Sequence, residues 1–114
     1  MKLPIDQVIY EAEKNGRYIP LQIRNRLKDQ KHCSSCKKKE IKKKQNRTID
    51  HIKPLWAGGK TEEKNLWTIC RDSHALKNKW EEELKKNKID VSSWNIEKWK
   101  SSFMEYEKNA KIQF

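Results

Sequence analysis

The feature that most constrains the fold is a succession of two short apolar runs and one amphipathic stretch. Residues 48–52 and 66–70 are rich in β-branched and other apolar side chains, which is typical of short strands. The residues between them, 53–65, contain a proline and a pair of glycines and therefore predict a loop. The stretch that follows carries apolar residues at helical spacing up to about Lys86. This order predicts an α+β fold built on two strands and a helix.

Further helices are predicted on both sides of this unit. Pro4 and Pro20 each suit the first turn of a helix, and Gly16 can end the first of the two. The apolar side of the second is formed by Leu21, Ile23 and Leu27, and its outer side by Arg24, Arg26 and Lys28. The predicted N-caps of the two later helices are Asp72 or Ser73 and Ser92 or Ser93.

The last predicted helix has one apolar stripe. It consists of Ile96, Trp99, Phe103, Tyr106 and Ala110. We interpret this stripe as core packing, and a dimer interface is the alternative.

The length of the chain predicts one domain over residues 1–114. Its motif-bearing core would span about 33–86, with helical extensions at 1–30 and 92–110. Hydrophobic residues make up only 34% of the chain, so its core is small. A core of this kind often needs an additional cross-link such as a bound metal ion. No apolar run approaches the roughly 20 residues of a membrane span, and the N-terminus has no pattern of a secretory signal. We therefore expect a cytoplasmic protein with no membrane partner.

The positive charge is concentrated in one block. The formal net charge is +11, and residues 17–47 carry +10 of it, because they contain twelve Lys or Arg and only two acidic residues. Such a block is typical of a surface that contacts nucleic-acid phosphates, and a solvated loop is the alternative. The candidate contacts are Arg24, Arg26, Lys37, Lys38, Lys39, Lys42, Lys43, Lys44 and Arg47.

Three residues of the strand-and-helix unit are suited to a divalent metal ion. Asp50 and His51 end the first predicted strand, and His74 lies in the first turn of the predicted helix. A hairpin followed by a packed helix can bring these side chains together. One carboxylate and two imidazoles would then form a metal site with an open position. Lys77 follows His74 by three residues, so the two share a helical face.

Several groups of residues stand in a specific order and spacing. They are Ile49-Asp50-His51-Ile52-Lys53-Pro54-Leu55, then Gly58-Gly59, then Asn65-Leu66-Trp67-Thr68-Ile69-Cys70, then His74-Ala75-Leu76-Lys77. This pattern resembles the HNH endonucleases, which are ββα-metal nucleases. Cys33-Ser34-Ser35-Cys36 adds to the resemblance, because many members carry a CxxC motif before the first strand. The similarity covers roughly residues 19–80 and implies a metal-dependent endonuclease that hydrolyses phosphodiester bonds of DNA.

The resemblance assigns a role to each matching residue. His51 would be the general base that accepts a proton from the attacking water. Asp50 and His74 would hold one divalent cation, Mg²⁺ or Mn²⁺, at the scissile phosphate. Asn65 would hold the loop between the strands and so orient His51, and Lys77 would contact a phosphate. The products would carry a 5′-phosphate and a 3′-hydroxyl.

The cysteines predict a second, structural metal site. Members with the CxxC motif usually bind zinc through four thiolates. The matching cysteines here are Cys33, Cys36 and Cys70, and Ser73 stands at the fourth position. Zinc could bind to three cysteines and a water, or to a substitute such as Asp72 or His32, which has no catalytic role in the motif. Otherwise zinc is absent and the cysteines are thiols or, less readily in a reducing cytoplasm, a disulfide.

Two other functions fit the sequence. The cysteines and the lysine-rich patch at 37–44 could form a zinc-ribbon module that binds DNA without cutting it. The chain could also be the nuclease subunit of a larger assembly, such as a phage packaging or restriction system. A homodimer would suit a double-strand break, since one ββα site cuts one strand.

Overall fold

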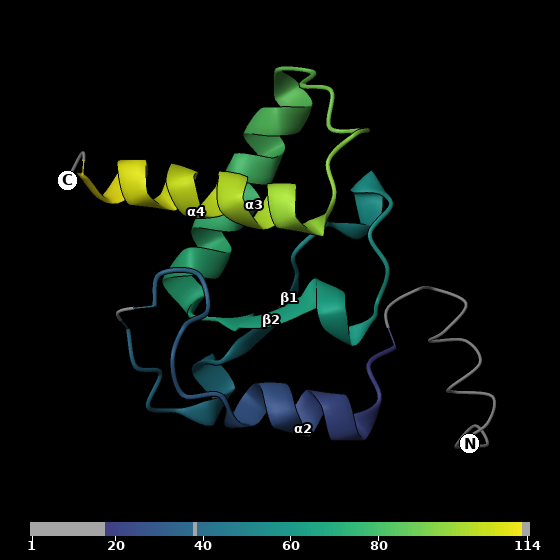
Figure 1. The fold of residues 1–114 in the computed structure, drawn as a ribbon. Coiled ribbons are helices and arrows are strands. Elements are labelled where there is room, and N and C mark those ends of the chain that lie inside the picture. The colour runs from purple at the N-terminus through teal and green to yellow at the C-terminus, as the bar shows by residue number, and fades with distance from the viewer. Residues whose placement is uncertain (1–17, 38, 113–114) are drawn as a thin grey trace, which may run out of the picture.

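The computed structural model describes residues 18–37 and 39–112 (Figure 1). The helix predicted between Pro4 and Gly16 lies outside these residues, as does the candidate phosphate contact Lys38. The helices and strands are α2 (Leu21–Asp29), β1 (Thr48–His51), β2 (Leu66–Ile69), α3 (Arg71–Lys86) and α4 (Ile96–Ile112). Short 3-10 turns occur at Lys44–Asn46, Leu55–Ala57 and Glu63–Asn65. The predicted α+β class is confirmed, and no helix in the described part is long and apolar enough to span a membrane.

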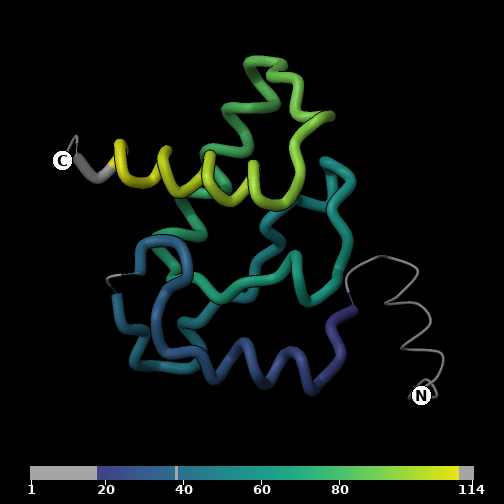
Figure 2. The backbone as a smooth tube through the Cα atoms, viewed as in Figure 1, coloured from purple at the N-terminus to yellow at the C-terminus, as the bar shows by residue number. Residues whose placement is uncertain are grey.

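The sheet is one antiparallel hairpin that lies between helices. Strand β1 pairs with β2 in a register that places Asp50 opposite Trp67. Helix α2 covers one side of the hairpin, while α3 and α4 lie on the other side (Figures 1 and 2). Alternate residues of β2 point to the two sides of the hairpin. Thr68 Oγ1 donates to Leu27 O of α2 at 2.5 Å, and Trp67 packs edge-on against Phe103 of α4. The two strands thus connect all three helices.

Helix α2 begins after Pro20, as predicted, but its predicted apolar side is wrong in part. Leu21 is 68% exposed, and no residue of α2 is buried. The helix is attached mainly through polar contacts: Lys28 is half-buried and its ammonium donates to Arg47 O, while Arg47 Nη1 donates to Lys28 O at 2.8 Å. The predicted outward position of Lys28 is therefore wrong as well. These contacts anchor α2 without a large apolar face.

The predicted N-caps of both later helices are also wrong. Helix α3 begins at Arg71, because the sulfur of Cys70 is the cap and accepts a hydrogen bond from Ser73 N at 3.4 Å. A sulfur is not an ordinary cap, so residue preference points instead to the oxygens that follow it. Before α4, the cap is Asn95, whose Oδ1 accepts from Lys98 N at 2.8 Å. The serines at 92 and 93 precede this turn, and Ser92 bonds to Asp90.

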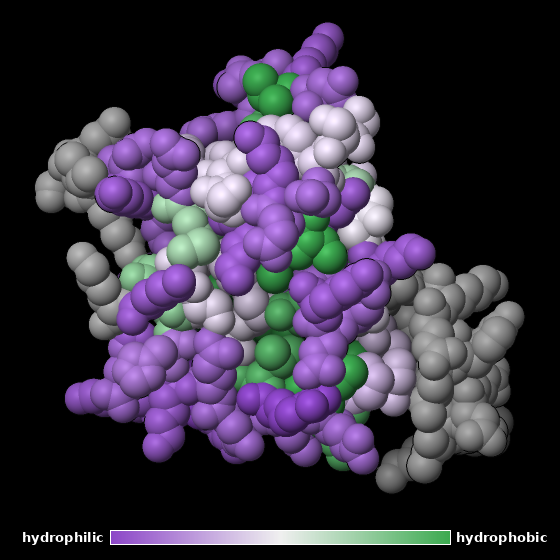
Figure 3. All heavy atoms as spheres, in the orientation of Figure 1, coloured by the Kyte–Doolittle hydropathy of each residue, from purple (hydrophilic) through white to green (hydrophobic). Residues whose placement is uncertain are grey.

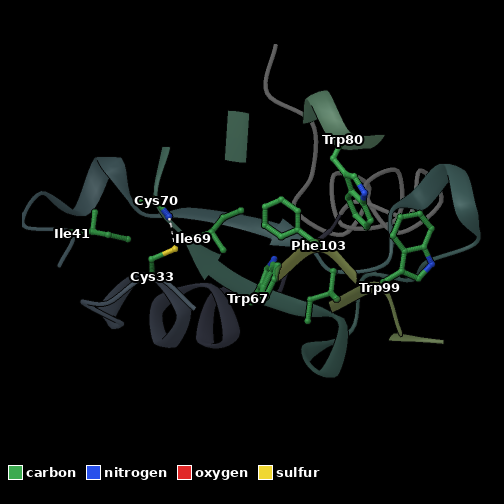
Figure 4. Packing of buried hydrophobic residues seen from close by; sticks show 9 residues of the cluster. Cys33, Ile41, Trp67, Ile69, Cys70, Trp80, Trp99 and Phe103 are labelled. Atoms are coloured by element: carbon green, nitrogen blue, oxygen red, sulfur yellow. Dashed lines mark hydrogen bonds between the residues drawn. The ribbon is translucent and has the colours of Figure 1, made fainter. Parts of the chain in front are cut away.

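The core lies between the hairpin and the pair α3 and α4. Trp99 and Phe103 of α4 are fully buried, and each ring lies 5.5 Å from Trp80 of α3. Figure 4 shows the cluster extending from Cys33 and Cys70 at one end to Trp80 and Trp99 at the other. The aromatic stripe of α4 is therefore core packing within the chain, as predicted.

Candidate active site

Asp50, at the end of β1, is held in a fixed orientation. Its carboxylate is 11% exposed and accepts a hydrogen bond on Oδ2 from Trp67 Nε1 at 2.8 Å. Trp67 is the cross-strand partner of Asp50, so the register of the hairpin creates this contact. Lys77 Nζ lies 3.1 Å from the same oxygen. These two donors occupy one side of the carboxylate.

The other oxygen of Asp50 faces the predicted second ligand. His74 Nε2 lies 3.9 Å from Asp50 Oδ1, and the His74 side chain is 37% exposed. A cation bonded to a nitrogen and an oxygen at about 2.0–2.2 Å each separates them by about 3–4 Å. The two donors can therefore hold one divalent ion between them with little movement. The exposure of His74 leaves room for a ligand from solvent.

His51 is the residue that follows Asp50, and its ring is held by the loop. His51 Nε2 lies 2.8 Å from Thr61 Oγ1. Asp50 and His51 line one shallow hollow together with Pro54, Leu55, Trp56, Asn78 and Glu81. Thr61 was missed at the sequence level, because a threonine in a polar loop has no signal of its own.

Asn65 holds the loop between the strands. Its side chain is buried and joins two distant backbone segments, since Oδ1 accepts from Lys53 N at 2.8 Å and Nδ2 donates to Lys60 O at 2.9 Å. Nδ2 also donates to Lys53 O at 2.9 Å. Lys60 immediately precedes Thr61, so Asn65 fixes the segment that carries the partner of His51. The structure therefore connects Asn65 to His51 through the loop.

Lys77 does not occupy the position that the resemblance implied. Its side chain is 1% exposed, and its ammonium bonds to His51 O at 2.9 Å and to Glu81 Oε2 at 2.6 Å in addition to Asp50. A buried ammonium between two carboxylates offsets their charge. The predicted phosphate contact of Lys77 is therefore wrong in this conformation. Its contacts join α3 to the end of β1.

The three cysteines form a compact cluster at the far end of the hairpin. Their sulfur atoms all lie within 4.8 Å of one another, which fits the donor set of a zinc site, and no disulfide joins them. Burial raises the pKa of the Cys33 thiol, but hydrogen bonding with the side chains of Ser35 and Ser73 and with the backbone of Cys36 and Cys70 outweighs it and lowers this pKa to about 6. Burial raises the pKa of Cys36. Asp72 is 80% exposed and pairs with Lys39, and neither it nor His32 joins the cluster.

Comparison with known proteins identifies the central segment. Residues 33–79 match the family model described as HNH endonuclease. The match covers less than half of the chain, and we refer to residues 33–79 as the HNH domain. No curated protein and no solved structure matches the chain. The HNH domain contains all three cysteines, the hairpin and the first half of α3, whereas α2 and α4 lie outside the match. HNH domains are nuclease-type, metal-binding modules, so the predicted resemblance is confirmed at this level.

The basic residues on and before the HNH domain divide into three groups. Arg47 is 7% exposed and donates from Nε to Ile41 O at 3.0 Å, so its predicted role as a phosphate contact is wrong. Three others are exposed but paired with acids: Arg26 with Glu63, Lys39 with Asp72, and Lys44 with Asp29. Exposed positions also include Arg24, Lys37, Lys42 and Lys43. Hydrophilic side chains gather at the lower left of Figure 3, and hydrophobic side chains are exposed beside them toward the lower centre.

Proposed function

We propose that the chain is a metal-dependent endonuclease that hydrolyses phosphodiester bonds of DNA. The observation that carries this proposal is the pair formed by Asp50 Oδ1 and His74 Nε2, 3.9 Å apart, next to the histidine that ends β1. The HNH match supports a nuclease-type function for the same residues.

Asp50 and His74 would hold one divalent cation, Mg²⁺ or Mn²⁺. When bound, this ion would offset negative charge on a phosphate oxygen and on the leaving 3′ oxygen. The protein contributes by fixing the donors. Trp67 and Lys77 both engage Oδ2 of Asp50, which keeps Oδ1 directed at His74. A cation with only two protein ligands retains positions for water and substrate.

His51 would act as the general base through Nδ1. A neutral imidazole that donates its Nε2 proton to Thr61 Oγ1 carries its basic lone pair on Nδ1. The proton of the attacking water would pass to that nitrogen. Thr61 would hold the ring in this orientation, and Asn65 would hold Thr61 through the preceding residue, Lys60. Both would be positioning residues.

The exposed basic residues around α2 and the following loop would bind the DNA backbone. Each phosphate that such a surface neutralises releases counterions, so binding should weaken as the salt concentration rises. A zinc-ribbon module that only binds DNA would share this salt dependence. The two functions differ in whether the phosphodiester bond breaks.

Supercoiled plasmid DNA distinguishes these two functions. With Mg²⁺ or Mn²⁺ the chain should convert it to the nicked circle, with a 5′-phosphate at the nick, and a chelator should stop the reaction. Asp50→Asn should remove most of the activity, whereas Asp90→Asn, an equal change at an exposed site, should not. Salt-sensitive binding without nicks under either metal would refute the proposal. An RNA of the same sequence, tested in parallel, shows whether the substrate is DNA alone.

A further inference from the structure

A buried carboxylate reaches the cysteine cluster from outside the HNH domain. Glu107 belongs to α4 and is only 2% exposed. Its Oε2 accepts a hydrogen bond from Ser73 Oγ at 2.5 Å. An ionised carboxylate buried away from water is costly unless positive charge or hydrogen bonds accompany it. Glu107 has such a hydrogen bond to Ser73. Ser73 stands at the fourth position of the cluster, where a cysteine is missing.

The oxygen of Ser73 occupies this fourth position. Ser73 Oγ lies 3.3 Å from Cys70 Sγ and 3.5 Å from Cys33 Sγ. In a tetrahedral zinc site with bonds of about 2.3 Å to sulfur and about 2.0 Å to oxygen, neighbouring sulfur and oxygen ligands are about 3.5 Å apart. The observed separations are close to this value.

The hydrogen bond to Glu107 also orients the Ser73 hydroxyl. A carboxylate can only accept, so the hydroxyl proton points to Glu107 and the oxygen lone pairs point to the thiols. This is the orientation that a metal ligand needs. A neutral hydroxyl alone is a weak zinc ligand, but a carboxylate that accepts a hydrogen bond from it increases the negative charge on its oxygen.

We propose that Ser73 Oγ is the fourth ligand of a zinc ion bound to Cys33, Cys36 and Cys70, and that Glu107 enables this role by accepting a hydrogen bond from the Ser73 hydroxyl. This assigns a metal-site function to α4, which lies beyond the HNH match. The proposal does not depend on the nuclease function, because it concerns zinc affinity alone.

Chelator competition on the full chain measures the effect directly. Glu107→Gln keeps the shape of the side chain and removes its charge, and it should lower the zinc affinity by about 10–100-fold. Glu105→Gln is the matched control, since it makes the same change on the exposed side of α4 and should bind zinc like the wild type. Wild-type zinc affinity in Glu107→Gln would overturn the proposal. If Glu107→Gln does not fold, Ser73→Ala replaces it, with the same expected loss and the same contradicting result.

The Ser73→Cys variant distinguishes a role of Glu107 at the metal site from a role in packing alone. In Ser73→Cys, four thiolates should bind zinc, and there is no hydroxyl that needs a hydrogen-bond acceptor. Adding Glu107→Gln to this variant should then leave the zinc affinity unchanged or raise it, because the carboxylate only repels the thiolates. An equal loss of affinity in both backgrounds would overturn the proposal. X-ray absorption should find three sulfurs and one oxygen around zinc in the wild type and four sulfurs in Ser73→Cys.

Discussion

At the scale of single residues, two neighbours at the end of β1, Asp50 and His51, are held by different partners. Asp50 is held by Trp67 and Lys77, and His51 is held by Thr61. Asp50 takes its partners from β2 and α3, and His51 takes its partner from the loop, while both residues line the same hollow. We propose that this separation lets one residue bind the cation while the other accepts a proton.

The contact between His51 and Thr61 leads to a prediction about rate. Thr61→Val keeps the shape of the side chain and removes the hydroxyl, so the imidazole loses its partner on Nε2. Nicking by Thr61→Val should be slower by about tenfold, a part of the total that a general base contributes. Thr61→Ser should restore the wild-type rate and its pH profile. Equal nicking rates in the wild type and Thr61→Val would show that the hydroxyl does not position the base.

Candidate site residues could be selected from the sequence where their residue type is uncommon in this chain and their order is specific. Asp50, His51 and His74 could be selected because few such residues occur and their order is specific. Thr61 and Glu107 could not, because their importance arises only from tertiary contacts. Lys77 and Arg47 were assigned to phosphate contact, yet both are buried. Charge alone does not reveal whether a cation faces solvent or pairs with groups inside.

At the scale of elements, the loop between the strands depends on two glycines in different ways. Gly58 has φ of +89°, a left-handed conformation, and a Cβ there would meet nothing within 4 Å. Gly59 has no space, since a Cβ would lie 1.8 Å from Lys53 O. That same carbonyl accepts from Asn65 Nδ2, so the loop closes at this point.

Substitution of the two glycines should therefore have unequal effects. Gly58→Ala introduces only backbone strain of about 1–2 kcal/mol. Gly59→Ala must displace the Lys53 carbonyl and with it the Asn65 contacts, and it should be the more destabilising change and also slow nicking. Thermal unfolding of both variants tests this order. A higher melting temperature for Gly59→Ala than for Gly58→Ala would contradict the structure of the loop.

The sequence predicted the existence of the elements better than their ends. Both strands and the three helices within the described residues were expected from periodicity and from their Pro and Gly boundaries. The caps were misassigned, because α3 uses a cysteine sulfur and α4 an asparagine nearer to its first turn. The exposure of α2 was also missed, since its apolar residues suggested packing and its polar contacts have no sequence pattern.

At the scale of the whole molecule, α4 contacts both α3 and the cysteine cluster. Trp99 and Phe103 pack on α3, and Glu107 reaches the cysteines. We propose that the chain is a single domain for this reason. Zinc would then stabilise the whole fold.

Zinc removal tests this stabilisation. An ion at about 100 times its dissociation constant stabilises a protein by about 2.7 kcal/mol. For a domain of this size, its removal should lower the melting temperature by roughly 10 °C or more. Added zinc should restore the melting temperature and Mg²⁺ should not. A variant with Cys33→Ser should melt at the same temperature with and without chelator. An unchanged melting temperature in the metal-depleted wild type would argue against a structural zinc.

We propose that the end of β1 forms a nuclease site with His51 as the base. Single-turnover nicking of supercoiled DNA by His51→Ala and His32→Ala is the decisive experiment. His51→Ala should be slower than the wild type by about 100-fold or more. His32→Ala removes an exposed imidazole that lies outside the site and should nick like the wild type. Equal nicking rates in His51→Ala and the wild type would show that His51 is not the base.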